Sequence, residues 1–339
     1  MTISRPHPVR VPAAAHQFVF DPDAVPALHI RSGDTILVET LDCFSGRLTA
    51  ESPPLRDDQD VLDHIGGRYN PVNRPIFVTE AEPGDVLAVD IIDIALGARQ
   101  GFAVTHVADD WARQFGGEDF AGSVAPATVI ARLDGGTIML PLDGGLIACP
   151  ARPMIGTIGT APAQSISSLL YGASHGGNLD CPLIRPGATV HLPVNVPGAL
   201  LSLGDVHALM GDGEITGTAL ETSADVTIRV RVEKNRRISL ATPRLSDDDC
   251  LGSLGCAARG SLQTNIQIAV RDLALSLEQA CGLSPGDALQ LFNLFGRITV
   301  NQAVGSDADG WSSVLAHIAR SDLDRVLSAI SPAPASRHS

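Results

Sequence analysis

The sequence predicts an α+β protein with a β-sandwich-like body of the jelly-roll type, followed by a helix-containing C-terminal portion. Short β-branched runs after glycine turns dominate the first two thirds of the 339-residue chain. After residue 240 the apolar residues change to helical spacing. We therefore expect a β-rich body carrying the functional site over residues 1–240, an α/β portion over 241–330 and a flexible tail over 331–339.

The body is expected to contain several strands that begin at glycine turns. Glycine supplies the positive φ that a type II turn needs, and a β-branched run extends from it. Such runs cover residues 35–40, 86–91 and 189–194. The clearest strand covers residues 225–233, where apolar and polar side chains alternate. This alternation predicts one face in the core and one in water.

The C-terminal portion is expected to be mainly helical. Apolar residues recur at helical spacing over residues 262–281, which predicts a helix of about five turns. A second helix over residues 288–295 follows a capping pattern that begins at Ser284. A short strand over residues 298–304 and a terminal helix over 321–330 complete this portion.

The charge of the chain argues against polyanionic partners. The 24 lysines and arginines are outnumbered by 38 aspartates and glutamates, for a formal net charge of −14. A chain this acidic repels phosphate backbones and anionic lipids, so we expect no nucleic-acid and no membrane partner. The sequence shows no apolar run of membrane-spanning length and no signal core, which favours a cytoplasmic location.

The basic and sulfur-containing residues exclude further classes of enzyme. Lys234 is the only lysine, against 23 arginines. Arginine does not lose its proton, so it cannot serve as a base or a Schiff-base nucleophile. Schiff-base enzymes, P-loop NTPases and lysine-dependent amidases are therefore excluded. The six cysteines form no C-x-x-C pair, and in a reducing compartment we expect them to be free thiols.

Acidic residues and histidines gather among glycines between residues 175 and 221. His175 and Asp180 are separated by a Gly-Gly pair, which lets the backbone fold tightly so that both side chains can converge. Asp205 and His207 are two residues apart and share one face of an extended strand. Carboxylates and imidazoles that face one another suit a divalent metal ion. Asp42, at the end of a strand, is a further candidate ligand.

Simpler explanations stay open for these groups. Asp-x-His pairs occur in many proteins without metal, Asp212-Gly213 fits a hairpin turn, and His175 could cap a backbone carbonyl. Cys43 and Cys181 each follow a candidate ligand, so in a strand they would face the opposite way and fill the core. Two histidines near acidic runs have no assigned role: His64 and His106.

Several segments of the chain match one family in the same order along the sequence. They are Asp42-Cys43, Asn70-Pro71-Val72, and residues 81–87, 153–162, 175–180, 192–200 and 204–221. Together these segments, which span roughly residues 10 to 310, resemble the acetamidase/formamidase family of metal-containing amidases.

The resemblance implies hydrolysis of the C–N bond of small linear or cyclic amides, such as formamide, acetamide or γ-lactams, by a metal-activated water. It also implies an amidohydrolase for bonds other than peptide bonds, a divalent metal, most simply Zn²⁺, with a second ion such as Ca²⁺ allowed, and a homodimer or higher homo-oligomer. The assigned metal ligands are Asp42, His175, Asp180, Asp205 and His207. The assigned catalytic acid–base residues are Glu214 and Glu221, and the assigned substrate-binding residue is Asn178.

Two departures from the family pattern affect the identity of the substrate. Where the family usually has Thr-Gly-Pro, this chain has Asn73-Arg74-Pro75, and the acidic stretch over residues 56–63 has no counterpart that we can match. Two other hypotheses stay open. One is a non-haem iron oxygenase on a β-sandwich, since two histidines and a carboxylate suit Fe(II). The other is a catalytically inactive relative that keeps the metal.

Overall fold

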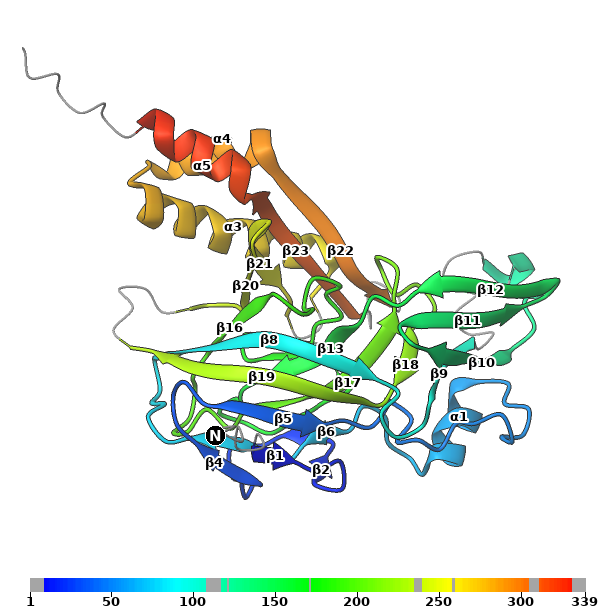
Figure 1. Ribbon diagram of the computed structural model, residues 1–339. Helices are drawn as coiled ribbons and strands as arrows, with labels where there is room; N and C mark the ends of the chain where they lie inside the picture. The colour runs from blue at the N-terminus through cyan, green and yellow to red at the C-terminus, as the bar shows by residue number, and fades with distance from the viewer. Residues whose placement is uncertain are drawn as a thin grey trace, which may run out of the picture.

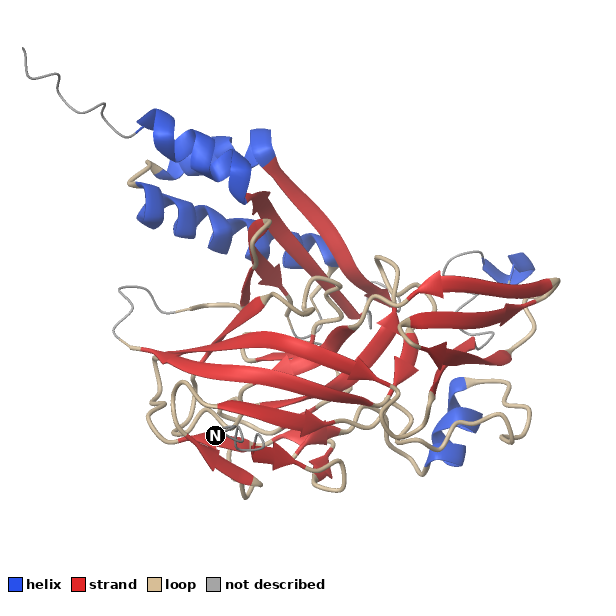
Figure 2. Ribbon diagram, viewed as in Figure 1, coloured by secondary structure: helices blue, strands red, loops and turns tan. Residues whose placement is uncertain are grey.

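A computed structural model of the protein describes residues 9–107, 117–120, 122–170, 172–234, 240–257, 260–304 and 311–330. Two large β-sheets form its body, and three helices gather at one end (Figures 1 and 2). The predicted α+β class is therefore confirmed. No helix within the described ranges is long and apolar enough to cross a membrane.

The first sheet has nine strands in the order β1-β5-β19-β8-β16-β20-β21-β23-β22. β1 and β5 are parallel, and the other neighbours in this sheet are antiparallel. In chain order the strands are β1 (Val9–Val11), β5 (Thr35–Glu39), β8 (Val86–Leu96), β16 (Thr189–Pro193), β19 (Ala224–Glu233), β20 (Arg244–Ser246), β21 (Cys250–Gly255), β22 (Gly296–Val304) and β23 (Trp311–Ala319).

The second sheet has ten strands, with the path β12-β11-β10-β9-β18-β17-β13-β15, while β6 pairs with β17 and β2 with β6. These strands are β2 (His16–Gln17), β6 (Val72–Asn73), β9 (Phe102–Val107), β10 (Ala127–Asp134), β11 (Thr137–Leu142), β12 (Gly145–Pro150), β13 (Met154–Gly159), β15 (Gly176–Asn178), β17 (Ser202–Leu209) and β18 (Leu220–Thr222). Two small pairs accompany the sheets, β3 (Val19–Phe20) with β14 (Ile166–Ser167) and β4 (Leu28–Ile30) with β7 (Ile76–Val78).

The two large sheets share one apolar core. It joins Val226 and Ile228 of β19, in the first sheet, to Ile155 of β13 and Val206 of β17, in the second. All four side chains are fully buried. The alternation predicted for residues 225–233 is thus confirmed, because the apolar side chains of β19 face the core and Arg229 faces water.

The predicted helices are also confirmed. They are α3 (Leu262–Cys281), α4 (Pro285–Phe295) and α5 (Arg320–Ile330), and a shorter helix, α1 (Asp58–Ile65), lies in the unmatched acidic stretch. Ser284 caps α4, since its hydroxyl accepts a hydrogen bond from the N–H of Asp287. The helices pack on β23 through their own apolar cluster.

The sheet does not stop at residue 240. β20, β21, β22 and β23 extend the first sheet beyond that position, and of these only β22 corresponds to a predicted strand. Figure 1 shows β22 and β23 running from the helices to the centre of the body. The division at residue 240 stays a prediction, and the tail over residues 331–339 lies outside the described residues.

Candidate active site

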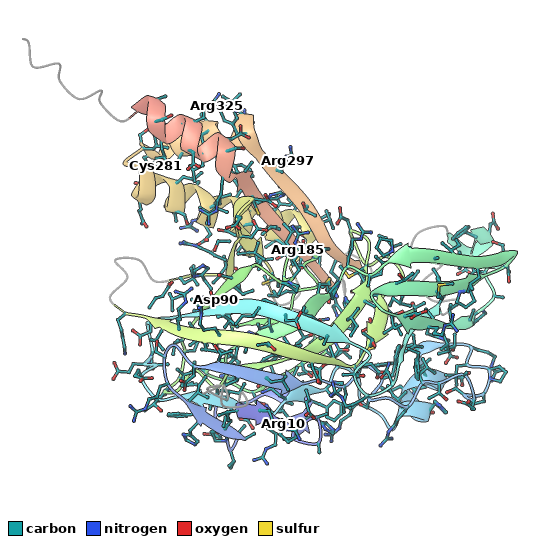
Figure 3. The ribbon with its side chains drawn as sticks, in the orientation of Figure 1. Arg10, Asp90, Arg185, Cys281, Arg297 and Arg325 are labelled. Atoms are coloured by element: carbon teal, nitrogen blue, oxygen red, sulfur yellow. The ribbon has the colours of Figure 1, made fainter. Side chains whose placement is uncertain are left out.

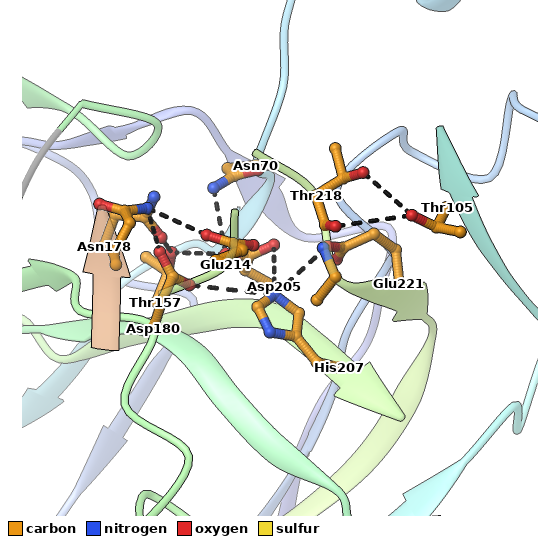
Figure 4. A network of polar contacts seen from close by, with 12 residues as sticks. Asn70, Thr105, Thr157, Asn178, Asp180, Asp205, His207, Glu214, Thr218 and Glu221 are labelled. Carbon is orange, nitrogen blue, oxygen red and sulfur yellow. Dashed lines mark hydrogen bonds and ion pairs between the residues drawn. The ribbon is translucent and has the colours of Figure 1, made fainter. Parts of the chain in front are cut away.

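Neighbouring strands of the second sheet carry a row of buried acid and imidazole side chains. Asp205 and His207 lie two residues apart on β17, and Glu221 of β18 is the register partner of His207. Nε2 of His207 lies 3.5 Å from Oδ1 of Asp205 and 3.4 Å from Oε1 of Glu221. The side chains of the predicted Asp-x-His pair, Asp205 and His207, therefore lie together on one side of β17 (Figure 4).

Asp180 reaches the same point from the end of β15. Its N–H donates to the carbonyl of Gly156 on β13, and its Oδ1 lies 3.9 Å from Nε2 of His207. A Cβ on Gly156 would lie 2.5 Å from Oδ1 of Asp180 and 2.7 Å from Oδ2 of Asp205. Only glycine at this position lets the two carboxylates approach each other so closely.

Glu214 enters from a turn that is fixed on β22. The N–H of Gly213 donates to the carbonyl of Asn301 at 3.1 Å. Nε2 of Gln302 then donates to Oε2 of Glu214 at 3.1 Å and to Oδ2 of Asp180. Gln302 was missed in the sequence, and no local signal marks it, because it comes from the C-terminal portion. We call the five facing residues the acidic cluster: Asp180, Asp205, His207, Glu214 and Glu221.

Polar side chains outside the acidic cluster form hydrogen bonds with Asp205. Oδ2 of Asp205 accepts a hydrogen bond from Nδ2 of Asn70 at 3.1 Å. The hydroxyl of Thr157 lies 3.1 Å from the same oxygen and 2.7 Å from Oδ1 of Asn178. Asn178, the predicted substrate-binding residue, is thus one side chain away from the cluster (Figure 4).

The backbone at the cluster is strained. Asn70, Asp180, Asp205 and Glu214 have φ values of 54°, 44°, 56° and 44°. Residues other than glycine avoid this left-handed region, and each such residue costs about 1–3 kcal/mol. Strain of this kind gathers where a functional arrangement demands it. Its concentration on three of the four cluster carboxylates makes the cluster the candidate functional site.

The electrostatics of the cluster are dominated by burial. Burial and the carboxylate of Glu214 raise the pKa of Asp180 well above its usual range. Burial likewise raises the pKa of Glu214 and, further still, that of Glu221. Burial alone would lower the pKa of His207, but the carboxylates of Glu221 and Asp205 outweigh it and raise that pKa well above the usual value. The cluster therefore holds protons that a bound cation would replace.

The residues present fit a divalent metal ion. Ligand atoms of Asp180, Asp205 and His207 lie within 4.8 Å of one another, and so do those of His207, Glu214 and Glu221. Among the described residues, no hydrogen-bond partner is found for Oδ1 of Asp180, Oε2 of Glu221 or either ring nitrogen of His207. Buried, unpartnered carboxylate and imidazole atoms are the donors that zinc and similar ions take.

Two predicted ligands are not brought into this group. Oδ1 of Asp42 accepts the N–H of Gly46 at 2.6 Å. The ring of His175 packs edge-on against Phe20, with 5.1 Å between ring centroids, and burial lowers its pKa to about 4. The convergence of His175 with Asp180 is therefore not seen in the structure. The assignment of Asp42 and His175 as ligands stays a prediction.

The prediction that Cys43 fills the core is confirmed, since it lies in a buried apolar cluster with Phe44 and Leu48, but the strand considered for it does not form. Residues 43–46 form a turn and not a strand, so Cys43 is free to turn inward. Its Sγ lies within 4.8 Å of carboxylate oxygens of Asp205 and Glu221. Burial and the nearby charge of Glu221 raise the pKa of this thiol well above its usual range, which disfavours the thiolate that a nucleophile needs. Cys181, as expected, fills the core.

A cavity of about 90 Å³ opens on the acidic cluster, and we call it the cluster cavity. Asp205, Glu214 and Glu221 of the cluster line it. The other described residues that line it include no lysine or arginine: Cys43, Phe44, Asp58, Val61, Tyr69, Asn70, His106, Leu169, Asn178, Gly217, Thr218, Gln302 and Trp311. Ligand sites for drug-sized molecules measure about 300–1,000 Å³, so this cavity suits a much smaller molecule.

Comparisons with known proteins agree on one family. The profile of the Acetamidase/Formamidase family matches residues 8–171 and 169–282. The crystal structure of an acetamidase from Bacillus halodurans is 33% identical, with a TM-score of 0.81, and the match covers 94% of this chain and 99% of that one. The structure of a predicted acetamidase/formamidase from Thermoanaerobacter tengcongensis is 31% identical, with a TM-score of 0.80, and the match covers 94% of this chain and 97% of that one.

A curated sequence gives a more distant match. The formamidase of Methylophilus methylotrophus is 27% identical over 260 residues, which are 63% of this chain and 63% of that protein. The chain thus spans less than two thirds of the length of the curated relatives it matches.

Proposed function

Because the chain belongs to the acetamidase/formamidase family, we propose that its acidic cluster hydrolyses the C–N bond of small amides other than peptides. The observation that carries the proposal is the position of the cluster. Four buried carboxylates and an imidazole lie together, three of the carboxylates on strained backbone, and Asp205, Glu214 and Glu221 line a cavity of about 90 Å³. This volume accommodates short amides and excludes a peptide chain.

We propose that the cluster holds a divalent cation, most simply zinc. Asp180, Asp205 and His207 would hold it, since their ligand atoms lie within 4.8 Å of one another. A cation bound there would polarise the amide carbonyl and lower the pKa of a water molecule from about 16 to about 7.

Glu221 is the stronger candidate for the catalytic base. Its Oε1 accepts the N–H of Ala219 at 2.9 Å, while its Oε2 has no partner among the described residues. Glu214, by contrast, is already engaged by Gln302 at Oε2. Once a bound cation has replaced the proton that burial favours on Glu221, its Oε2 would take a proton from the attacking water and return it to the leaving nitrogen. The products are a carboxylic acid and ammonia.

The first experiment measures ammonia release from formamide, acetamide and propionamide, and ring opening of γ-lactams, on one chelator-treated and zinc-restored sample. We expect activity to vanish with chelation and return with zinc. Metal-replete protein without turnover of any amide would overturn the proposal and favour the inactive relative. Oxygen consumption without ammonia would favour the iron oxygenase.

The role of Glu221 has its own test. Glu221→Gln keeps the shape of the side chain but removes the base, so we expect bound metal to persist while kcat falls by about 10² or more. Metal content and ammonia release are measured on the same sample. Loss of the metal from this variant would instead make Glu221 a ligand. Asp212→Asn, an exposed carboxylate two residues from Glu214, is the matched control and should leave both unchanged.

We also propose that the chain forms a homo-oligomer. The support is the presence of two exposed apolar side chains on β12, where Leu146 and Ile147 are 58% and 48% exposed. β12 is an edge strand of the second sheet, and exposed apolar edge strands tend to pair with another chain. Sedimentation velocity tests this, and a monomer at all concentrations would overturn it.

A further inference from the structure

A buried histidine lines the cluster cavity, and the hydrolysis described above does not use it. His106 lies on β9, the strand beyond β18, and is 4% exposed. Its neighbour on the same face, Val104, is the register partner of Glu221. Side chains two residues apart on a strand share a face and lie about 7 Å apart. His106 on β9 and Glu221 on β18 therefore face the same cavity from adjacent strands.

Hydrogen bonds hold both the ring and the backbone of His106 in place. Its Nδ1 lies 3.0 Å from the hydroxyl of Thr128 on β10. Its backbone N–H donates to the hydroxyl of Thr218 at 3.3 Å, and that hydroxyl donates to the His106 carbonyl at 2.8 Å. Thr218 lies on the Glu221 side of the network in Figure 4. Only Nε2 of the ring is thus left for a further contact.

Nε2 of His106 has no hydrogen-bond partner among the described residues, although it is buried. A buried polar atom without a partner is costly, so such an atom in a native structure calls for an explanation. Phe44 and Val61 supply apolar parts of the cavity wall, and Asp58 and Tyr69 supply polar ones. Burial lowers the pKa of the imidazole and outweighs the opposing charge of Asp58, so the ring enters the cavity as a neutral hydrogen-bonding group.

We infer that Nε2 of His106 binds a hydroxyl group on the acyl chain of the substrate, so that the enzyme prefers short hydroxyamides to alkyl amides of the same size. A hydroxyl both donates and accepts, so it suits either tautomer of the ring. The amide end of such a molecule lies at the acidic cluster and its hydroxyl at His106. This inference rests on the proposed amide hydrolysis and names the class of amide.

The test uses pairs of amides with equal numbers of heavy atoms. Glycolamide is compared with propionamide, and β-hydroxypropionamide with butyramide, on the zinc-restored wild type, His106→Leu and His106→Gln. For at least one pair we expect wild-type kcat/KM to favour the hydroxyamide about tenfold, as one hydrogen bond allows. His106→Leu should remove this preference by lowering the hydroxyamide value, with alkyl amides within about threefold of wild type. His106→Gln should keep part of it.

Two kinetic results would overturn the inference. One is equal wild-type kcat/KM for both members of each pair. The other is an equal loss for hydroxyamides and alkyl amides in His106→Leu, which would show a purely structural histidine.

A binding measurement separates this inference from the proposed function. Hydroxyacetone and butanone replace the amide nitrogen by a methyl group and cannot be hydrolysed. We expect hydroxyacetone, but not butanone, to shift the ¹⁵N resonance of Nε2 of His106, identified by its absence in His106→Gln. This shift would support the binding role even if no amide were turned over, a result that would defeat only the proposed hydrolysis. A resonance that responds to neither ketone would overturn the inference whatever the turnover.

Discussion

Two buried carboxylate sites in this molecule have opposite designs. Asp272 of α3 is 6% exposed, and its two oxygens accept hydrogen bonds from Nε and a terminal nitrogen of Arg244 at 2.7 and 2.9 Å, and from Ser253 at 2.6 Å. The acidic cluster brings four carboxylates together around one imidazole. Among the described residues that line its cavity there is no lysine or arginine.

The difference shows what each site is for. A carboxylate with its own guanidinium has its charge and its lone pairs satisfied within the fold, so it ties α3 to β20 and β21. The carboxylates of the cluster keep atoms without partners and raised pKa values. A buried carboxylate that has no cationic side chain beside it is tolerated where a bound ligand supplies the positive charge. The predictions below test this contrast.

The largest effect is expected at the imidazole that the carboxylates surround. His207→Ala removes the nitrogen that faces Asp205 and Glu221, so metal binding and turnover should be lost together. Metal content by elemental analysis and ammonia release are measured on the same preparation. An active variant with its full metal content would contradict this prediction. It would show that the acidic cluster, like Asp272, is not a metal site.

The compensated site should respond in stability and not in activity. Arg244→Met leaves the carboxylate of Asp272 buried and unpaired, and we expect the free energy of unfolding to fall by about 3–5 kcal/mol. Urea unfolding gives this value. The double variant Arg244→Met/Asp272→Leu should recover most of the loss, since neither charge remains. Ammonia release by the folded variant should equal that of wild type; a drop in kcat without unfolding would mean that the two sites are coupled.

The close approach of the cluster carboxylates can be tested at one glycine. Gly156→Ala places a methyl group against Asp180 and Asp205, so we expect weaker metal retention and a loss of about 1–3 kcal/mol in stability from overpacking. Gly211→Ala is the matched control, because a Cβ there meets nothing within 4 Å. Metal titration measures the metal retention of both variants, and urea unfolding measures their stability. Equal behaviour of the two would show that the tight approach is not needed.

The smallest effect is expected at a half-buried ion pair on the first sheet. Asp90 of β8 (Figure 3) accepts hydrogen bonds from Arg229 and Arg231. Burial raises its pKa, but the bonds from Arg231, Thr189 and Arg229 outweigh burial and lower the value to about 2. The pKa of an unfolded aspartate is about 3.9. The pair therefore stabilises the fold above that pH, and this contribution is lost as the pH falls through about 2.

We expect Asp90→Asn to cost at most about 1 kcal/mol at neutral pH, and the difference from wild type to shrink as the pH falls from about 4 to about 2. Urea unfolding at several pH values measures this. Asp93→Asn, an exposed neighbour on the same strand, is the control. A difference that grows in acid would contradict the assigned direction of the pKa shift.

The parts of the site that depend on local patterns could be predicted. The alternation of a strand predicted Asp205 beside His207, and the glycines before Asp180 have positive φ values, which suits the tight backbone predicted there. The helices and their caps follow from spacing of the same local kind. Their prediction needed no knowledge of the fold.

The parts that depend on tertiary contacts could not be predicted. Gln302 joins Asp180 across 122 residues of sequence, and Asn70 joins Asp205 across 135. His175 was expected to converge with Asp180, but its ring packs against Phe20 instead. Each of these outcomes was decided by a distant partner. Cys43 differs, because a local turn in which Gly46 binds the carboxylate of Asp42 replaces the strand considered there.

The contribution of β22 to the acidic cluster also determines when the cluster can form during protein synthesis. Gln302 follows Glu214 by 88 residues, so a ribosome completes β17 and β18 well before it reaches the strand that fixes the Glu214 turn. Domains fold as their segments emerge during synthesis. The acidic cluster is therefore completed only after β22 has been synthesised and has docked on the Glu214 turn.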